Sequence, residues 1–185
     1  MEGECFACEA GFLMQEPTTD RRETLAISHD AAAAFIGISS GAYWDVESYR
    51  DEVWFACDMI HLARMCVLYD LDPALFVIDE YRASSDEESV ADYALSDASL
   101  AEELRKALGD KIGDEEATGW DKDGLARWLS SDEALAAMPV MALGDVCNCI
   151  GVPTVRIFRR YLRGFGRSTR HEEDFPSSPA FIPKS

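Results

Sequence analysis

Apolar residues dominate one continuous stretch of the chain, residues 54–69 (WFACDMIHLARMCVLY). The stretch is too long for an ordinary strand and contains neither glycine nor proline, so it predicts one long, mostly buried helix. Helical periodicity assigns part of this stretch to the protein core. The residues expected to be buried are Trp54, Met59, Leu62, Ala63, Cys66 and Leu68.

The rest of the pattern also favours helices. Alanine, leucine and acidic residues are abundant, while the alternation of valine and isoleucine that marks strands is nearly absent. Two S-x-x-E sequences, Ser99 with Glu102 and Ser130 with Glu133, match the capping box, in which a hydroxyl and a carboxylate satisfy free backbone N–H groups. The sequence therefore predicts an all-α protein of at least nine helices, two of which begin near those serines.

A stretch rich in serine and acidic residues, 83–98 (ASSDEESVADYALSDA), separates two groups of predicted helices. It holds few large apolar side chains, which favours a linker or an exposed helix. The last residues carry three prolines and are expected to be extended unless something docks them. The expected organisation is a first helical module (1–83), an acidic linker or exposed helix (84–98), a second small helical module with a basic last helix (99–171) and a Pro-rich tail (172–185).

Residues 28–52 (SHDAAAAFIGISSGAYWDVESYRDE) have the spacing of a helix-turn-helix unit. An Ala-rich helix is expected to end at Gly37, and a second helix is expected to begin near Ser39 or Ser40. Within residues 21–80, the sequence AAAAFIGIS, the late Glu47 and the closing run HLARMCVLYDLDPALF occur in this order. In these motifs the chain resembles the XRE (Cro/CI-type) helix-turn-helix family. The resemblance implies an XRE-like module whose recognition helix, residues 39–52, would enter the major groove of DNA.

The predicted recognition helix departs from that family in its charge. Four acids lie on it against Arg50 alone, and the other residues that usually contact base edges, asparagine and glutamine, are absent from it. Since phosphate contacts supply much of the affinity for DNA, an acidic helix is poorly suited to this role. The scaffold resembles a DNA-binding module, whereas its surface does not.

Acidic residues outnumber basic ones across the chain of 185 residues, 35 to 17, for a net charge of −18. All the acids except Glu172, Glu173 and Asp174 precede residue 152, whereas residues 152–171 contain six arginines and no acid. Most of the surface is therefore expected to repel phosphate, and one short segment is expected to attract it.

That basic segment repeats the earlier pattern of helix, glycine turn and helix. In residues 143–163 (LGDVCNCIGVPTVRIFRRYLR), Cys149-Ile150-Gly151-Val152 matches Phe35-Ile36-Gly37-Ile38. One interpretation is a nucleic-acid-binding face made of Arg156, Arg159, Arg160 and Arg163. The other is a closing helix that buries Val155, Phe158 and Leu162 while its arginines cover the acidic body.

Metal binding and catalysis find little support in the sequence. Cys5 and Cys8 have zinc-ligand spacing, but Cys147 and Cys149 are separated by one residue and would diverge on a helix, so no metal or other cofactor is expected. All six cysteines are expected to be reduced thiols. Cys57 and His61 with Asp58 imitate a nucleophile and base, but they lie on a helix predicted to be buried. Residues 119–130 lack the first and twelfth ligands of a calcium loop. We therefore expect no enzyme and no small-molecule substrate.

The predicted recognition helix combines aromatic residues with acids, and helical periodicity cannot bury all of its aromatic side chains. Trp44 is the one that an XRE-like core could hold. Aromatic anchors surrounded by carboxylates suit a basic protein surface. The first hypothesis is an acidic protein that neutralises a basic protein partner, as an immunity protein, antitoxin or nuclease inhibitor does. Its predicted contact residues are Tyr43, Trp44, Asp45, Glu47, Tyr49, Asp51 and Glu52.

The alternative hypothesis is a transcriptional regulator that binds DNA through the arginine helix or as a dimer. Under either hypothesis a cytoplasmic location is expected, because no stretch approaches the roughly 18 apolar residues of a membrane span. The acidic N-terminus also differs from the positive start of a signal peptide.

Overall fold

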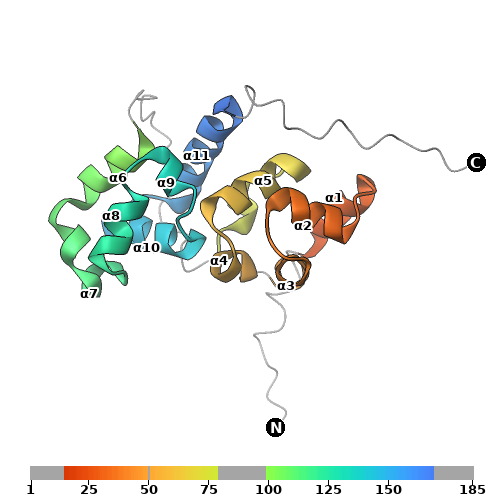
Figure 1. Ribbon diagram of the computed structural model, residues 1–185, viewed down its shortest axis with the longest axis horizontal. Coiled ribbons are helices and arrows are strands. Elements are labelled where there is room, and N and C mark those ends of the chain that lie inside the picture. Colours follow the sequence, from red (N-terminus) through yellow and green to blue (C-terminus); the bar gives the residue numbers. More distant parts are fainter. Residues whose placement is uncertain (1–14, 50, 79–98, 169–185) are drawn as a thin grey trace, which may run out of the picture.

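The computed structural model describes residues 15–49, 51–78 and 99–168, and all regular structure within them is helical (Figure 1). Eleven α-helices and two 3-10 helices make up these ranges, and no strand is present in them apart from one isolated bridge between Asp58 and Pro139. The predicted all-α class, with at least nine helices, is confirmed. None of the described helices is both long enough and apolar enough to cross a membrane.

The first half contains five α-helices and a 3-10 helix: α1 (Gln15–Thr24), α2 (His29–Ile36), α3 (Ser40–Ser48), α4 (Glu52–Ala56), α5 (Met59–Tyr69) and η1 (Pro73–Phe76). Helix α2 ends at Gly37, whose φ of 96° is in the left-handed region that favours glycine. The Ser39 hydroxyl then accepts a hydrogen bond from the Ala42 N–H and caps α3. Both predicted helix boundaries in this unit are confirmed.

Two expectations about helix length are wrong. The helix predicted over 54–69 is interrupted at Cys57 and Asp58, whose backbones are extended. The reason is long-range: the Met59 N–H donates to the Met138 carbonyl (2.9 Å), and the Val140 N–H donates to the Cys57 carbonyl (3.0 Å). Similarly, α3 ends at Ser48 instead of continuing to residue 52, because the next residue is extended. Of the predicted core residues in 54–69, all are buried except Leu68, which is half-buried.

The second half contains α6 (Leu100–Leu108), η3 (Gly109–Gly113), α7 (Glu115–Thr118), α8 (Lys122–Trp128), α9 (Asp132–Leu135), α10 (Val140–Ile150) and α11 (Thr154–Ser168). Ser99 caps α6 as predicted, by accepting from the Glu102 N–H. The second serine predicted from a capping box, Ser130, is not a cap: Ser131, one residue later, caps α9 by accepting from the Ala134 N–H. Asp121 lies in residues 119–130, the segment compared above with a calcium loop, and it caps α8 by accepting from the Gly124 N–H at 2.7 Å.

A single apolar core extends across both halves. Helix α11 packs against α10 on one side and against α5 and η1 on the other, and Figure 1 shows it between the two groups of helices. The Trp54 ring lies 5.9 Å from the Phe158 ring, and its indole N–H donates to the Phe76 carbonyl. Residues from both halves therefore contribute to one shared core. The predicted linker (84–98) and tail (172–185) lie outside the described residues.

Candidate protein-binding surface on α3 and α4

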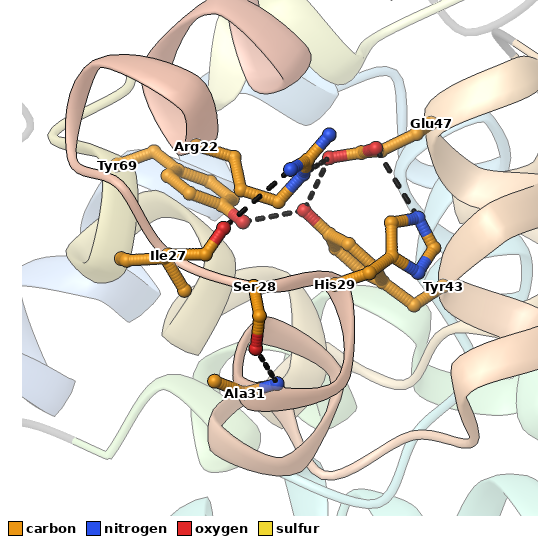
Figure 2. A network of polar contacts seen from close by, with 8 residues as sticks. All are labelled: Arg22, Ile27, Ser28, His29, Ala31, Tyr43, Glu47 and Tyr69. Carbon is orange, nitrogen blue, oxygen red and sulfur yellow. Dashed lines mark hydrogen bonds and ion pairs between the residues drawn. The ribbon is translucent and has the colours of Figure 1, made fainter.

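Tyr43 and Glu47, two of the predicted contact residues, point into the protein. Tyr43 has no exposed surface, and Glu47 is 8% exposed. One Glu47 carboxylate oxygen accepts from Arg22 Nε (2.8 Å) and from the Tyr43 hydroxyl (2.6 Å), while the other lies 3.3 Å from His29 Nε2. Figure 2 shows these side chains converging, with Tyr69 hydrogen-bonded to Tyr43. The expectation that Tyr43 and Glu47 contact a partner is therefore wrong: they join α3 to α1, α2 and α5.

The charges of this buried network are balanced inside the protein. The hydrogen bond to Glu47 raises the pKa of Arg22, so that the guanidinium remains charged beside the carboxylate. Burial raises the pKa of Tyr43, and it raises the pKa of Tyr69 to about 12. Both phenols are therefore neutral at pH 7. Tyr43 donates its proton to Glu47, which leaves Tyr69 to donate to the Tyr43 oxygen. No unpaired charge of this network is offered to a partner.

The opposite face of α3 is exposed. Trp44 lies on it and is 56% exposed, which excludes the alternative that Trp44 belongs to the core. Tyr49, in the extended residue after α3, is 54% exposed. Phe55 on α4 is 65% exposed, while its neighbours Val53 and Trp54 are buried. The sequence pattern does not distinguish Phe55, because it lies within a run that is apolar on both sides. The short helix α4 turns this one ring outward.

Three carboxylates accompany these rings. Asp51 is exposed, and Asp45 and Glu52 are half-exposed. Among the residues that the structure describes, no cation lies within ion-pair distance of any of the three. Helices α3 and α4 pack against each other and lie side by side in Figure 1. We call this set the aromatic-acidic surface; its members are Trp44, Asp45, Tyr49, Asp51, Glu52 and Phe55.

The arginines of α11 are arranged differently. Arg159 pairs with Asp72 at the start of η1 (3.0 Å). Arg160 forms a forked pair with Glu103 of α6, in which Nη2 donates to Oε1 at 2.8 Å. The bond to Glu103 raises the pKa of Arg160. Arg163 is exposed and its Nε donates to the Arg159 carbonyl, and Arg156 is half-buried. Two of the four candidate nucleic-acid contacts thus neutralise carboxylates of the protein itself.

The inner face of α11 matches the closing-helix interpretation. Phe158 is completely buried, and Ile157 and Tyr161 are also buried. Val155 and Leu162, the other two residues expected to pack inward, are half-buried against the core. The sequence could not identify the partners of the arginines, because Asp72 and Glu103 lie far away along the chain.

The side chains that the sequence suggested as a nucleophile, a base or a metal ligand are covered by the protein: Cys57 and Cys147 are buried, and His61 is half-buried. Burial raises the pKa of the Cys57 and Cys147 thiols to about 12 in each case, so both are protonated and unreactive at pH 7. His61 Nδ1 accepts from the Asp58 N–H (3.1 Å) at the start of α5, and burial lowers the pKa of its ring. Cys5 and Cys8 lie outside the described residues. Within the described ranges, no three His, Cys, Asp or Glu side chains are placed to hold a metal ion.

No protein-family model, curated protein or solved structure matches this chain.

Proposed function

We propose that this chain is a non-catalytic binding protein that neutralises a basic protein partner, in the manner of an immunity protein, antitoxin or nuclease inhibitor. The observation that carries the proposal is the aromatic-acidic surface. Its three rings are each more than half exposed, and its three carboxylates have no cationic partner among the described residues. Rings of this kind supply contact energy at protein interfaces, and carboxylates steer the approach of a basic partner.

The rest of the chain supports a scaffold role. In this proposal α2, the Gly37 turn and α3 form an XRE-like scaffold, in which Glu47 attaches α3 to α1 and α2 and, through Tyr43, to α5. The proposed action is non-catalytic because the Cys57 thiol, the strongest nucleophile candidate in the sequence, is buried and protonated. The buried free cysteines suit the reducing cytoplasm, which is where we propose that the protein acts.

A helix-turn-helix DNA-binding regulator is the second candidate, and the α2-turn-α3 geometry favours it. Two observations weigh against it. The described exposed side chains of α3 include no cation, and Arg159 and Arg160 are already paired with Asp72 and Glu103. Since phosphate contacts from arginine and lysine supply most nonspecific affinity for DNA, these features favour a protein partner.

A charge-reversal comparison tests the proposal. The variant Asp45→Lys/Asp51→Lys/Glu52→Lys reverses the surface, and Asp110→Lys/Glu115→Lys/Glu116→Lys reverses three exposed acids in the second half. Both change the net charge equally. Wild type and the second variant should retain one basic protein from a lysate of the source cells at roughly physiological salt, and the first variant should lose it.

A gel shift with genomic DNA fragments separates the two candidates. The regulator predicts that reversing the acids on α3 and α4 strengthens DNA binding and that Arg156→Ala/Arg163→Ala abolishes it. Sequence-specific DNA retention that depends on these arginines, with no basic protein captured, would exclude the proposed function.

A further inference from the structure

We infer that the aromatic-acidic surface recognises arginine side chains in preference to lysine, so that the partner presents an arginine-rich surface. This inference rests on the proposed function and specifies its partner. It follows from the combination of groups within residues 44–55, where exposed rings occur together with carboxylates that have no cationic partner among the described residues. These groups lie on two packed helices, α3 and α4, and on the residues between them.

A guanidinium can use both kinds of group at once. Its flat, weakly hydrated face stacks on an aromatic ring, while its edge donates a pair of hydrogen bonds to a carboxylate. An ammonium is a compact and strongly hydrated charge, so it gains from the carboxylates but much less from the rings. A surface of carboxylates alone would not distinguish the two cations. The three exposed rings, Trp44, Tyr49 and Phe55, are what makes the distinction.

Both arginine contacts already occur within this protein. The Arg127 guanidinium carbon lies 5.7 Å from the centroid of the Trp128 ring. Arg160 donates from its two terminal nitrogens to the two oxygens of Glu103. The aromatic-acidic surface presents the rings and carboxylates that such contacts require, and no described arginine pairs with them.

The surface is also held in place before a partner arrives. The Glu47 network attaches the buried side of α3 to α1, α2 and α5 (Figure 2). Val53 and Trp54, the two residues before the exposed Phe55, anchor α4 in the core. A preorganised surface loses less conformational entropy on binding, so contacts with its rings can appear as affinity.

The test uses the full chain and two synthetic peptides of equal length and charge, nona-arginine and nona-lysine, in calorimetric titrations at roughly physiological salt. The arginine peptide should bind about tenfold more tightly than the lysine peptide. Trp44→Ser/Tyr49→Ser/Phe55→Ser should remove this preference and leave lysine-peptide binding unchanged. The matched control Leu25→Ser/Val67→Ser/Leu75→Ser, which truncates exposed apolar residues elsewhere, should retain it. Circular dichroism and unfolding midpoints verify that each variant is folded.

The outcomes separate this inference from the proposed function. Equal affinity for the two peptides, or a preference that survives loss of the three rings, would overturn the arginine selectivity. In that case a loss of peptide binding in Asp45→Lys/Asp51→Lys/Glu52→Lys would still support the binding surface. If that variant binds both peptides as wild type does, while Asp110→Lys/Glu115→Lys/Glu116→Lys does not, the contact lies elsewhere and both proposals fail.

Discussion

Helices α3 and α11 each follow a turn at a glycine with a positive φ, but their charged side chains have different partners. Gly37 and Gly151 have φ values of 96° and 71°. After each glycine, the next N–H returns to a carbonyl near the end of the previous helix, from Ile38 to Ala33 and from Val152 to Cys147. Both bonds are the 6→1 bond of a Schellman motif. The second bond of that motif is present at Gly151, which donates to the Asn148 carbonyl, whereas Gly37 donates to the Ala33 carbonyl.

The two helices differ in where their charged side chains find partners. On α3, the charged residue that is paired is the buried one, Glu47, and the outward acid, Asp45, has no described partner. On α11, the buried face is apolar, and two outward arginines pair with carboxylates of η1 and α6. Net charge alone therefore does not identify an interaction surface. Among the described residues, α3 differs in having a carboxylate without a cationic partner next to an exposed ring.

The largest expected effect is the loss of the α11 anchor. Phe158→Ala should lower the free energy of unfolding by about 3–5 kcal/mol, because it empties the site beside Trp54 where the two halves meet. Phe55→Ala removes the same side chain from an exposed position and should change stability by less than about 0.5 kcal/mol. Urea unfolding of both variants measures the difference. Similar losses in the two would contradict the assignment of α11 as a closing helix.

The second effect concerns the buried charge of α3. Glu47→Ala should cost about 3 kcal/mol, since it leaves the guanidinium of Arg22 and the hydroxyl of Tyr43 without their acceptor. Asp45→Ala, on the same helix but half-exposed and without a described ion pair, is the matched control and should cost no more than about 0.5 kcal/mol. Thermal and urea unfolding measure both. If the two variants are equally stable, Glu47 does not hold α3 in place.

Local sequence signals predicted the end of α2, the turn at Gly37 and the start of α3. Each of these depends on residues within one turn of a helix, such as the cap Ser39. The prediction of one continuous helix over 54–69 was wrong because the break at Cys57 and Asp58 is stabilised by backbone hydrogen bonds to residues 136–140. Such pairing between distant segments leaves no mark in local periodicity.

The same limit explains the errors at the predicted contact surface. Aromatic and acidic residues occur on both faces of α3, so its composition does not reveal which side is buried. The decisive partner of Glu47 is Arg22, on a different helix. A signal was nevertheless available, because Tyr43 and Glu47 are four residues apart and share a helical face with Val46. That face continues the core, which leaves Trp44 outside.

Smaller effects should separate the two ion pairs of α11. Arg160 and Glu103 are mostly covered and form a forked pair, whereas the Arg159 and Asp72 side chains are 52% and 50% exposed. A double-mutant cycle with Arg160→Ala and Glu103→Gln should give a coupling energy of about 1 kcal/mol. The cycle with Arg159→Ala and Asp72→Asn should give less than about 0.5 kcal/mol and should vanish at high salt.

The substitution at Asp72 must retain its second role. Its carboxylate also accepts from the Ala74 N–H (2.8 Å) at the start of η1, and asparagine can replace that acceptor. An alanine variant would add the loss of this cap to the loss of the ion pair. A larger coupling energy for the exposed pair than for the covered pair would reverse the expected order.

The smallest effect on stability is expected at Trp44, where a different measurement is informative. Trp44→Phe should change the free energy of unfolding by less than about 0.5 kcal/mol, because the ring is 56% exposed. The difference in fluorescence between wild type and this variant isolates Trp44 from the buried Trp54 and the half-buried Trp120 and Trp128. Neighbouring carboxylates concentrate cations and repel anions, so the ratio of the caesium to the iodide quenching constant should fall from wild type to Asp45→Asn/Asp51→Asn/Glu52→Asn. Asp110→Asn/Glu115→Gln/Glu116→Gln should leave this ratio unchanged. An equal ratio in the wild type and the first variant would mean that the charge beside Trp44 is already neutralised, and α3 would then resemble α11 in the feature that most separates them.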